Sequence, residues 1–265
     1  MNDFDLVTEM ARAAEAAAAL LRRQSLPSPY TTWPEFKDRF DAIDQLVSAE
    51  LRERLSALRP GVPWSEELST DATYAGERWV VDPVDGAVQY LQGLPQWCVS
   101  VSLARDGRAV ATALHSATLH ETYTAVAGGG AFLNGAPIAP SAKKDLSLAL
   151  VTSSHPPFAS RQPAAIDATA RAIGKLLPAL GALRNLGPTA WQIADVASGR
   201  VDAFWQYGLD PGNLLGAALV VSEAGAEVTD VDGAPWHVGS TSFLAAAPGL
   251  HGRLVELLSR GEDES

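Results

Sequence analysis

The pentapeptide Asp82-Pro83-Val84-Asp85-Gly86 constrains the fold and chemistry of this chain more than any other segment. It directly follows Trp79-Val80-Val81, a short apolar run that predicts a buried strand, so the two carboxylates fall in a polar turn at the strand end. Two carboxylates three residues apart, with a proline between them, can turn back toward one point. Together with a backbone carbonyl they offer the oxygen ligands that Mg²⁺ prefers.

The same pentapeptide also suits a bound anion. Gly86 lets the backbone pass close to such a group, and free N–H groups at the start of a following helix could hold phosphate oxygens. The alternative is a simple turn closed by an aspartate side chain, because Asp, Pro and Gly are common turn formers. Upstream, Glu66-Glu67 could add a carboxylate to the cluster, or could form a solvated acidic loop.

Composition limits the classes of partner. The 265 residues are enough for one large domain or two closely packed halves, and 47% are hydrophobic. The net charge of -11 argues against DNA or RNA, whose backbone needs a basic face, but a metal ion could still recruit a small phosphorylated substrate. The apolar runs are too short to span a bilayer. The single cysteine, Cys98, and an acidic start without a basic signal-peptide region predict a cytoplasmic protein.

Hydrophobic periodicity predicts a mixture of helices and strands. The expected helices cover residues 4–23, 38–58, 163–180, 190–197 and 214–224. The expected strands cover residues 79–81, 97–104, 109–115, 121–126, 148–152, 201–205 and 226–229. Because these elements lack the regular βαβ period of a doubly wound sheet, we expect a layered α+β fold, with a second half beginning near residue 140.

Several separated motifs resemble those of the inositol monophosphatase-like family of Mg²⁺-dependent phosphatases. That family carries an acidic Gly-Glu-Glu loop, an Asp-Pro-(Ile/Leu/Val)-Asp-Gly-Thr turn, a Gly-x-Pro before an apolar strand, a Gly-x-Gly-Ala-Phe-x-Asn-Gly hairpin and a closing Glu-Ala-Gly-Gly. The similar segments here are Ser65-Glu66-Glu67, Asp82–Ala87, Tyr90, Gly93, Pro95, Val99–Leu103, Gly128–Gly135, Gly199–Ala203, Ser222–Ala226 and Thr229–Gly233. The resemblance covers roughly residues 38–247.

The resemblance implies an α+β fold, the layered αβαβα sandwich of the inositol monophosphatase and fructose-1,6-bisphosphatase type. It also implies Mg²⁺ as cofactor and a homodimer. Residues 1–140 would form an N-terminal half that carries the metal-binding motifs, and residues 141–265 a C-terminal half that completes the active site.

The resemblance further assigns roles to individual residues. Asp44 and Glu66 would position the attacking water, and Asp85 would act in both catalysis and substrate binding. Gly86 and Ala87 would form part of the phosphate cradle. The implied metal ligands are Glu66, Asp82, the carbonyl of Val84, Asp85 and Asn213.

Three positions depart from the family pattern. The family's turn ends in a threonine whose hydroxyl acts on the water, and here that residue is Ala87. When positions are counted back from Glu223, Asn213 stands where the family has its last metal-binding Asp, and Gln206 stands where it has its substrate-binding Glu. A locally shifted alignment would place Asp210 instead of Asn213 at the metal-binding position. The ungapped count is favoured because it fits two fixed points of the family pattern at once. Each amide removes one negative charge and keeps one carbonyl oxygen.

We therefore expect a Mg²⁺-dependent phosphomonoesterase acting on a small polyol, sugar or nucleotide phosphate, attenuated or altered by Ala87, Gln206 and Asn213. The alternative is a catalytically inactive family member that acts as a binding or regulatory protein. The expected partner is a small phosphorylated molecule, with neither nucleic acid nor membrane involved.

Overall fold

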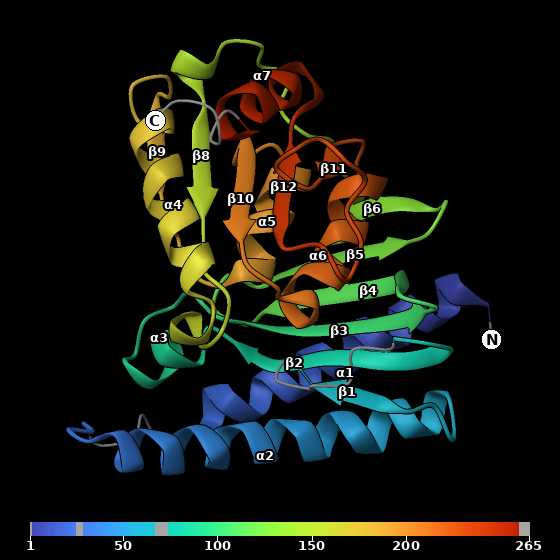
Figure 1. Cartoon of the computed structure of the whole chain (residues 1–265). Helices are drawn as coiled ribbons and strands as arrows, with labels where there is room; N and C mark the ends of the chain where they lie inside the picture. Colours follow the sequence, from blue (N-terminus) through green and yellow to red (C-terminus); the bar gives the residue numbers. More distant parts are fainter. Residues whose placement is uncertain (1, 25–28, 67–73, 260–265) are drawn as a thin grey trace.

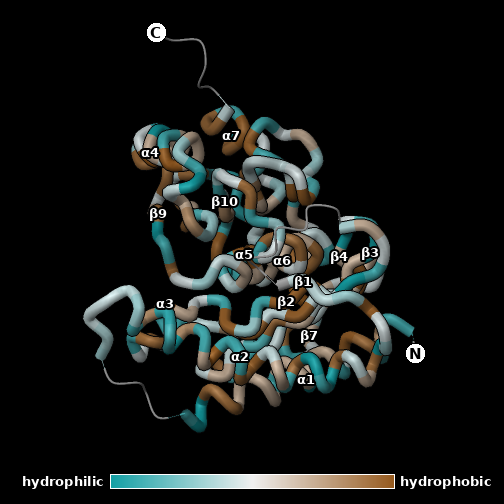
Figure 2. The backbone as a smooth tube through the Cα atoms, turned by 60° about the horizontal axis from the view of Figure 1, so that its bottom comes forward, coloured by the Kyte–Doolittle hydropathy of each residue, from teal (hydrophilic) through white to brown (hydrophobic). Residues whose placement is uncertain are grey.

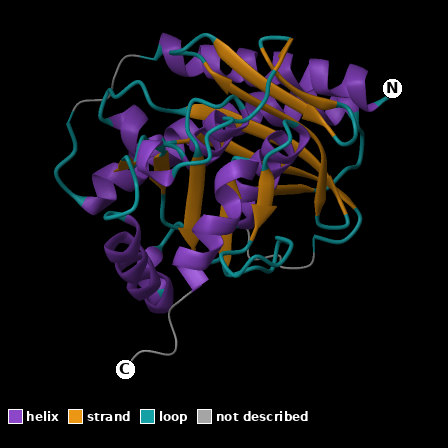
Figure 3. Ribbon diagram, turned by 90° about the horizontal axis from the view of Figure 1, so that it is seen from above, coloured by secondary structure: helices purple, strands orange, loops and turns teal. Residues whose placement is uncertain are grey.

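The chain folds into five alternating layers of helices and sheets (Figure 1). This computed structural model describes residues 2–24, 29–66 and 74–259. Helices α1 and α2 cover one face of a first sheet, α5 and α6 lie between the two sheets, and α4 and α7 cover the far face of the second sheet. The expected layered αβαβα sandwich is confirmed. Figure 3 shows the layers from above, with helices flanking the strands.

The first sheet has seven strands in the order of the sequence. All neighbours are antiparallel except the first pair, which is parallel. The strands are β1 (Trp64–Glu66), β2 (Glu77–Asp85), β3 (Cys98–Arg105), β4 (Arg108–Ser116), β5 (Glu121–Val126), β6 (Gly130–Leu133) and β7 (Ala136–Pro137).

The second sheet has five strands in the order β11-β12-β10-β8-β9. β12 runs antiparallel to both of its neighbours, whereas β10, β8 and β9 are parallel. The strands are β8 (Leu150–Ser153), β9 (Ala182–Arg184), β10 (Ala203–Tyr207), β11 (Glu227–Thr229) and β12 (Ser242–Ala246). The described strands of the first sheet thus precede residue 140 and those of the second follow it, while the middle helices contact both sheets.

The described residues contain seven α-helices and two short 3-10 helices. The α-helices are α1 (Asp3–Arg23), α2 (Trp33–Leu58), α3 (Ala87–Leu91), α4 (Pro163–Leu176), α5 (Thr189–Ala197), α6 (Pro211–Glu223) and α7 (Pro248–Ser259). The 3-10 helices are η1 (Leu146–Leu148) and η2 (Ala159–Arg161). Among the described residues, no helix has the length and apolarity needed to cross a membrane.

Local signals fix the outer helices α1 and α2. Asn2 caps α1 by accepting from the Asp5 N–H at 2.9 Å. α2 begins with a capping box in which Thr32 and Glu35 each accept from the other's backbone N–H. Both helices alternate polar and apolar residues along their length, as Figure 2 shows, so each packs one face on the first sheet.

Polar groups join the layers at several points. The Tyr123 hydroxyl on β5 donates to Asp195 Oδ1 on α5 at 2.9 Å and lies 2.8 Å from Ser198 Oγ. Burial raises the pKa of Asp195 to about 6. Arg200 lies 3.6 Å from the same Asp195 oxygen and forms a two-bond ion pair with Glu121. The middle layer is therefore held to the first sheet by a specific network in addition to apolar packing.

Glu223 unites two of the sequence motifs. It is the last residue of α6, and its carboxylate accepts from the N–H groups of Gly128 and Gly130 at 2.8 and 2.9 Å. The glycine hairpin and the Glu-Ala-Gly segment, almost a hundred residues apart, thus form one structural contact.

Helix α6 is buried on most sides, so its packing depends on small residues. At Gly216 an added Cβ would lie 2.1 Å from Ser102 Oγ on β3 and 3.2 Å from a Thr112 methyl on β4. Ser102 cannot simply turn away, because its hydroxyl is hydrogen-bonded to Thr112 Oγ1 at 3.0 Å. Gly216 thus allows α6 to approach the first sheet closely.

The predicted elements agree with the structure except at some boundaries. α2 begins at Trp33, five residues earlier than expected, and β2 continues through Asp85 where a turn was expected after Val81. The expected ranges did not include strands β1, β6, β7, β9 and β12 or helices α3 and α7.

We expect Gly216→Ala to lower the free energy of unfolding by about 1–3 kcal/mol, the usual cost of overpacking a core. Gly252→Ala in α7 is the matched control, since its new Cβ would meet nothing within 4 Å. Replacing this helical glycine should stabilise the chain by up to about 1 kcal/mol. Urea unfolding of both variants measures the difference, and equal effects would contradict the close approach of α6.

Candidate active site

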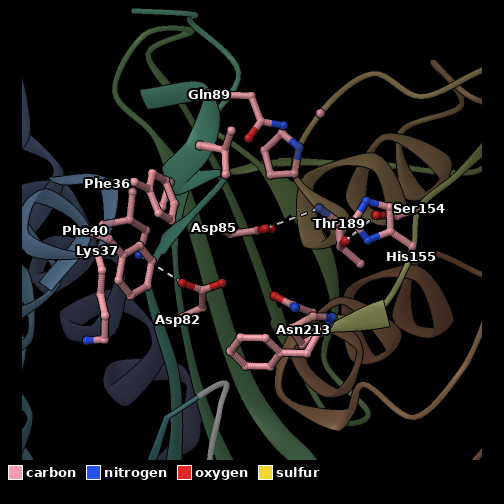
Figure 4. Close-up of a pocket in the computed structure, with 18 of the residues that line it drawn as sticks. Phe36, Lys37, Phe40, Asp82, Asp85, Gln89, Ser154, His155, Thr189 and Asn213 are labelled. Atoms are coloured by element: carbon pink, nitrogen blue, oxygen red, sulfur yellow. Dashed lines mark hydrogen bonds between the residues drawn. The ribbon is translucent and has the colours of Figure 1, made fainter. Parts of the chain in front are cut away.

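One cavity collects most of the residues that the sequence analysis singled out. It has a volume of about 690 Å³ and lies where the end of β2 and the start of α3 meet α2, α6 and the loops before η2 and α5. Asp82, Val84, Asp85, Gly86, Ala87 and Asn213 all line it. The N-terminal and C-terminal halves of the chain therefore both contribute to the same site (Figure 4).

A β-bulge brings the two aspartates to the same cavity. In a regular strand, residues three apart point to opposite faces of the sheet. Here Asp82 pairs with Ser100 and Asp85 with Cys98, so three steps along β2 match two along β3. The extra residue is a bulge, a feature that often redirects side chains near active sites. The side chains of Asp82 and Asp85 both lie at the cavity.

Both carboxylates are buried, and the protein supports them with backbone donors. Asp82 is 4% exposed, and its Oδ1 accepts from the Val84 N–H at 2.9 Å. Asp85 is 6% exposed, and it accepts from the N–H groups of Thr189 at 3.3 Å and Ala190 at 2.8 Å. Such donors are what allow a carboxylate to remain charged inside a protein.

The two donors to Asp85 are the first N–H groups of α5. Pro188, the N-cap residue of that helix, provides no side-chain cap. Asp85 acts as the cap from a distant strand and places its negative charge at the positive end of the helix. No sequence pattern predicted this contact, although Gly187-Pro188-Thr189 before an apolar helix carries the signal of a helix start.

Cys98 lies behind the aspartates, and its Sγ donates to Asp85 Oδ2 at 3.8 Å. Burial, followed by the charges of Asp85 and Asp82, holds the pKa of the Cys98 thiol well above its ordinary value. The buried thiol therefore stays protonated and has a structural role, not a nucleophilic one.

The turn after Asp85 has no room for a larger residue than glycine. Gly86 has φ +90°, and an added Cβ would lie 2.7 Å from the Gln96 carbonyl oxygen and 3.2 Å from Trp97 Cα. Ala87 then begins the short helix α3, and its side chain is buried at the cavity wall. The first turn of α3 therefore faces the cavity with a methyl group where the family pattern has a hydroxyl.

The two amides Gln206 and Asn213 share one buried carboxylate. The Gln206 side-chain N–H donates to Asp210 Oδ2 at 2.8 Å, and that of Asn213 donates to Asp210 Oδ1 at 3.0 Å. Asp210 is 2% exposed and is absent from the described cavity lining, which Asn213 joins. Asn213 thus lines the cavity together with Asp82 and Asp85, and the Asp210 carboxyl group lies behind it.

Two other predicted residues, Asp44 and Glu66, are not among the residues described as lining the cavity. Asp44 is a half-buried residue of α2, one turn beyond the helical positions that line the cavity. The backbone of Glu66 pairs with Val81 on β2, while its side chain and the whole of Glu67 lie outside the described residues. The cavity also has an aromatic wall on α2 that the sequence analysis did not identify.

Comparison with known proteins agrees with this geometry. The family model for the inositol monophosphatase family matches residues 3–262. An inositol monophosphatase of Dictyostelium discoideum is 30% identical over 84% of this chain and 85% of its own length. A Nus factor SuhB of Pseudomonas aeruginosa is 31% identical over 84% of each chain. The solved inositol monophosphatase of Anabaena has a TM-score of 0.82 at 25% identity, over 98% of this chain and 97% of that one.

These relatives identify the chain as a phosphoric monoester hydrolase. The chain belongs to the inositol monophosphatase family, as its motifs predicted. Members of this family are generally Mg²⁺-dependent.

The residues present fit one hard divalent cation. Asp82, Asp85 and Asn213 bring carboxylate and amide groups to the same cavity, which Val84 also lines. Oxygen donors of this kind suit Mg²⁺. Among the described side chains no cluster of three or more His, Cys, Asp or Glu could hold a metal. The family resemblance assigns the third carboxylate to Glu66, whose side chain lies outside the described residues.

We expect Asp85→Asn to lower the free energy of unfolding by about 1–3 kcal/mol even in a chelating buffer, because an amide cannot accept both α5 N–H groups. Asp82→Asn is the matched control, since its remaining oxygen can still accept from Val84. Its cost should stay below about 1 kcal/mol. Denaturant unfolding in EDTA tests the pair. A smaller loss for Asp85→Asn than for Asp82→Asn would show that the helix cap contributes little.

Proposed function

We propose that the chain is a Mg²⁺-dependent phosphomonoesterase for a small polyol, sugar or nucleotide phosphate. The observation that carries the proposal is the convergence of buried Asp82 and Asp85 with Asn213 at one cavity. Oxygen ligands for a cation lie beside the start of α5 and at a cavity. This arrangement suits the hydrolysis of a phosphate ester.

The roles follow from the chemistry of each group. Asp82, Asp85, the Val84 carbonyl and Glu66 would hold the cation, with Asn213 as a weaker ligand from α6. When bound, Mg²⁺ would neutralise charge on the phosphoryl oxygens and activate a water for in-line attack. Gly86 and Ala87 would let the phosphate approach the backbone closely, with Asp85 also contacting substrate. Asp44 and Glu66 would orient the water.

The three replacements predict a slow enzyme on ordinary family substrates. Losing the hydroxyl at Ala87 or a carboxylate at Gln206 or Asn213 would each cost on the order of 10²–10³ in rate. The losses need not multiply, because residues that act as a unit are non-additive. The same replacements support the second candidate function, a binding or regulatory protein that has lost hydrolysis.

The partners follow from charge and family. The expected partner is a small phosphorylated molecule, since a net charge of -11 disfavours the nucleic-acid backbone. We also expect a cytoplasmic homodimer, the assembly that the family resemblance implies.

Titration calorimetry with Mg²⁺ or Mn²⁺ tests the metal site. We expect one site without substrate, weakened more than about tenfold in Asp82→Asn because a neutral oxygen binds Mg²⁺ less well than a carboxylate. Asp167→Asn, at an exposed position on α4, controls for the loss of one charge. Unchanged binding in Asp82→Asn would refute the ligand assignment. A parent that releases phosphate from no ester, with the metal bound, would favour the binding-protein candidate.

A pair of substitutions tests the role of Asn213. Asn213→Asp alone would place a second carboxylate within hydrogen-bond distance of Asp210, so the repulsion should oppose any gain in metal affinity. Asn213→Asp with Asp210→Asn exchanges the two groups and keeps both the net charge and the hydrogen bond. We expect the exchange to bind a second cation more tightly than either single variant, and adding Ala87→Thr to raise the rate of phosphate release further. Calorimetry and a phosphate-release assay measure both effects. If Asn213→Asp alone performs as well as the exchange, Asp210 does not control this ligand position.

A further inference from the structure

The cavity wall formed by α2 is aromatic. Trp33, Phe36 and Phe40 lie along one face of α2 and all line the cavity. Their rings contact one another in series, with centroids 5.2 Å apart for the first pair and 6.2 Å for the second. Figure 4 shows Phe36 and Phe40 on the side of Asp82. The three rings form a continuous surface, here called the aromatic wall.

The rim of the cavity adds apolar side chains whose exposure to solvent is energetically unfavourable. Trp33 is 66% exposed, Val88 54% and Phe158 45%. Apart from Phe4 on α1, Trp33 and Phe158 are the only strongly exposed Phe or Trp side chains among the described residues. Exposed apolar side chains gathered around one cavity indicate a binding surface.

Phe158 is held in a strained position across from α2. Its φ is +52°, a left-handed conformation that is unfavourable for a bulky residue. The Arg161 guanidinium lies over its ring, 4.5 Å from the centroid. Backbone strain of this kind is found preferentially at binding and active sites. The second aromatic surface is thus positioned at the cavity mouth against the local backbone preference.

The polar groups on α2 beside the aromatic wall are already paired. Lys37 Nζ lies 2.5 Å from Asp41 Oδ2, and both residues line the cavity. A polyol bound here would place its hydroxyl groups against the ring faces, which are poorer hydrogen-bond acceptors than water. Removing those hydroxyl groups from water would therefore cost free energy. A flat ring would gain apolar burial and a favourable ring contact.

We propose that the substrate is a phosphate monoester of an alcohol that carries an aromatic or heteroaromatic ring, with that ring packed against the aromatic wall. This inference rests on the proposed phosphatase function and narrows its substrate class. The phosphate would lie at the Asp82 and Asp85 end, and a short linker would carry the ring to Phe36 and Phe40. A cavity of about 690 Å³ has room for both parts.

Matched esters test the substrate class. We expect kcat/KM for 2-phenylethyl phosphate to exceed that for inositol 1-phosphate at least about tenfold. Phe40→Ala and Phe36→Ala should each lower kcat/KM for the phenyl ester about three- to tenfold, the usual contribution of one ring contact. Both should leave glycerol 3-phosphate, which has no ring, nearly unchanged. Phe40→Leu, which keeps an apolar side chain of similar size, covers the case in which the alanine variant does not fold.

Phe4→Ala is the matched control, because Phe4 is 56% exposed on α1 and does not line the cavity. The inference is overturned if kcat/KM is higher for inositol 1-phosphate than for 2-phenylethyl phosphate. It is also overturned if the Phe36 and Phe40 variants leave kcat/KM for the phenyl ester unchanged. If no ester is hydrolysed, the phosphatase function fails, and calorimetry with 2-phenylethylphosphonate and Mg²⁺ then decides the inference alone. Binding that weakens about three- to tenfold in Phe40→Ala supports it, and binding that is absent or unchanged refutes it.

Discussion

The contact between Asp85 and the first N–H groups of α5 is the interaction on which the site depends. Asp85 belongs to the first sheet, α5 lies between the sheets, and the bond joins them at the cavity. A buried carboxylate needs such donors, and a buried helix start needs such an acceptor, so each satisfies the other's requirement. One group therefore both closes the fold and faces the proposed substrate. Many changes at Asp85 will alter stability as well as chemistry, whereas Asp82, with a local backbone donor, reports more directly on the metal site.

Sequence patterns predicted those parts of the fold that local physics determines. Helix α1 has a cap and a clear apolar face, and the central hairpins have turns such as Asp106-Gly107, so their ranges were nearly correct. Strand β12 escaped prediction because it is short and buried on both faces, so it shows no alternation. Helix α7 does carry a helical period, with Leu250, Leu254 and Leu258 buried, and was overlooked. The end of β2 was wrong because a proline between two aspartates resembles a turn, whereas pairing with β3 keeps the segment extended with a bulge.

The site shows the same division. The ligand candidates Asp82, Asp85 and Asn213 follow from motifs and spacing, and the structure places them at one cavity. The aromatic wall could have been found from the helical spacing of Trp33, Phe36 and Phe40, but the helix was expected to begin after two of these residues. The shared hydrogen bonds of Asp210 could not have been predicted, because they depend on how β10 enters α6. Contacts between residues on either side of such a turn leave no repeating pattern in the sequence from which they could be predicted.

The position of Asp210 changes how the three replacements are interpreted. Two lost carboxylates suggest a site with less negative charge, yet one carboxylate remains between the two amides. Because it accepts from the N–H of each amide, it fixes which end of Gln206 and Asn213 is available to other groups. The Asp210 carboxyl group thus lies behind the cavity, outside its described lining. Under the proposed function, an aromatic wall beside the phosphate-binding end would suit a substrate that is polar mainly at its phosphate. Under the proposed function, the amide replacements and the aromatic wall would belong to one change in specificity, with the metal site kept at Asp82 and Asp85.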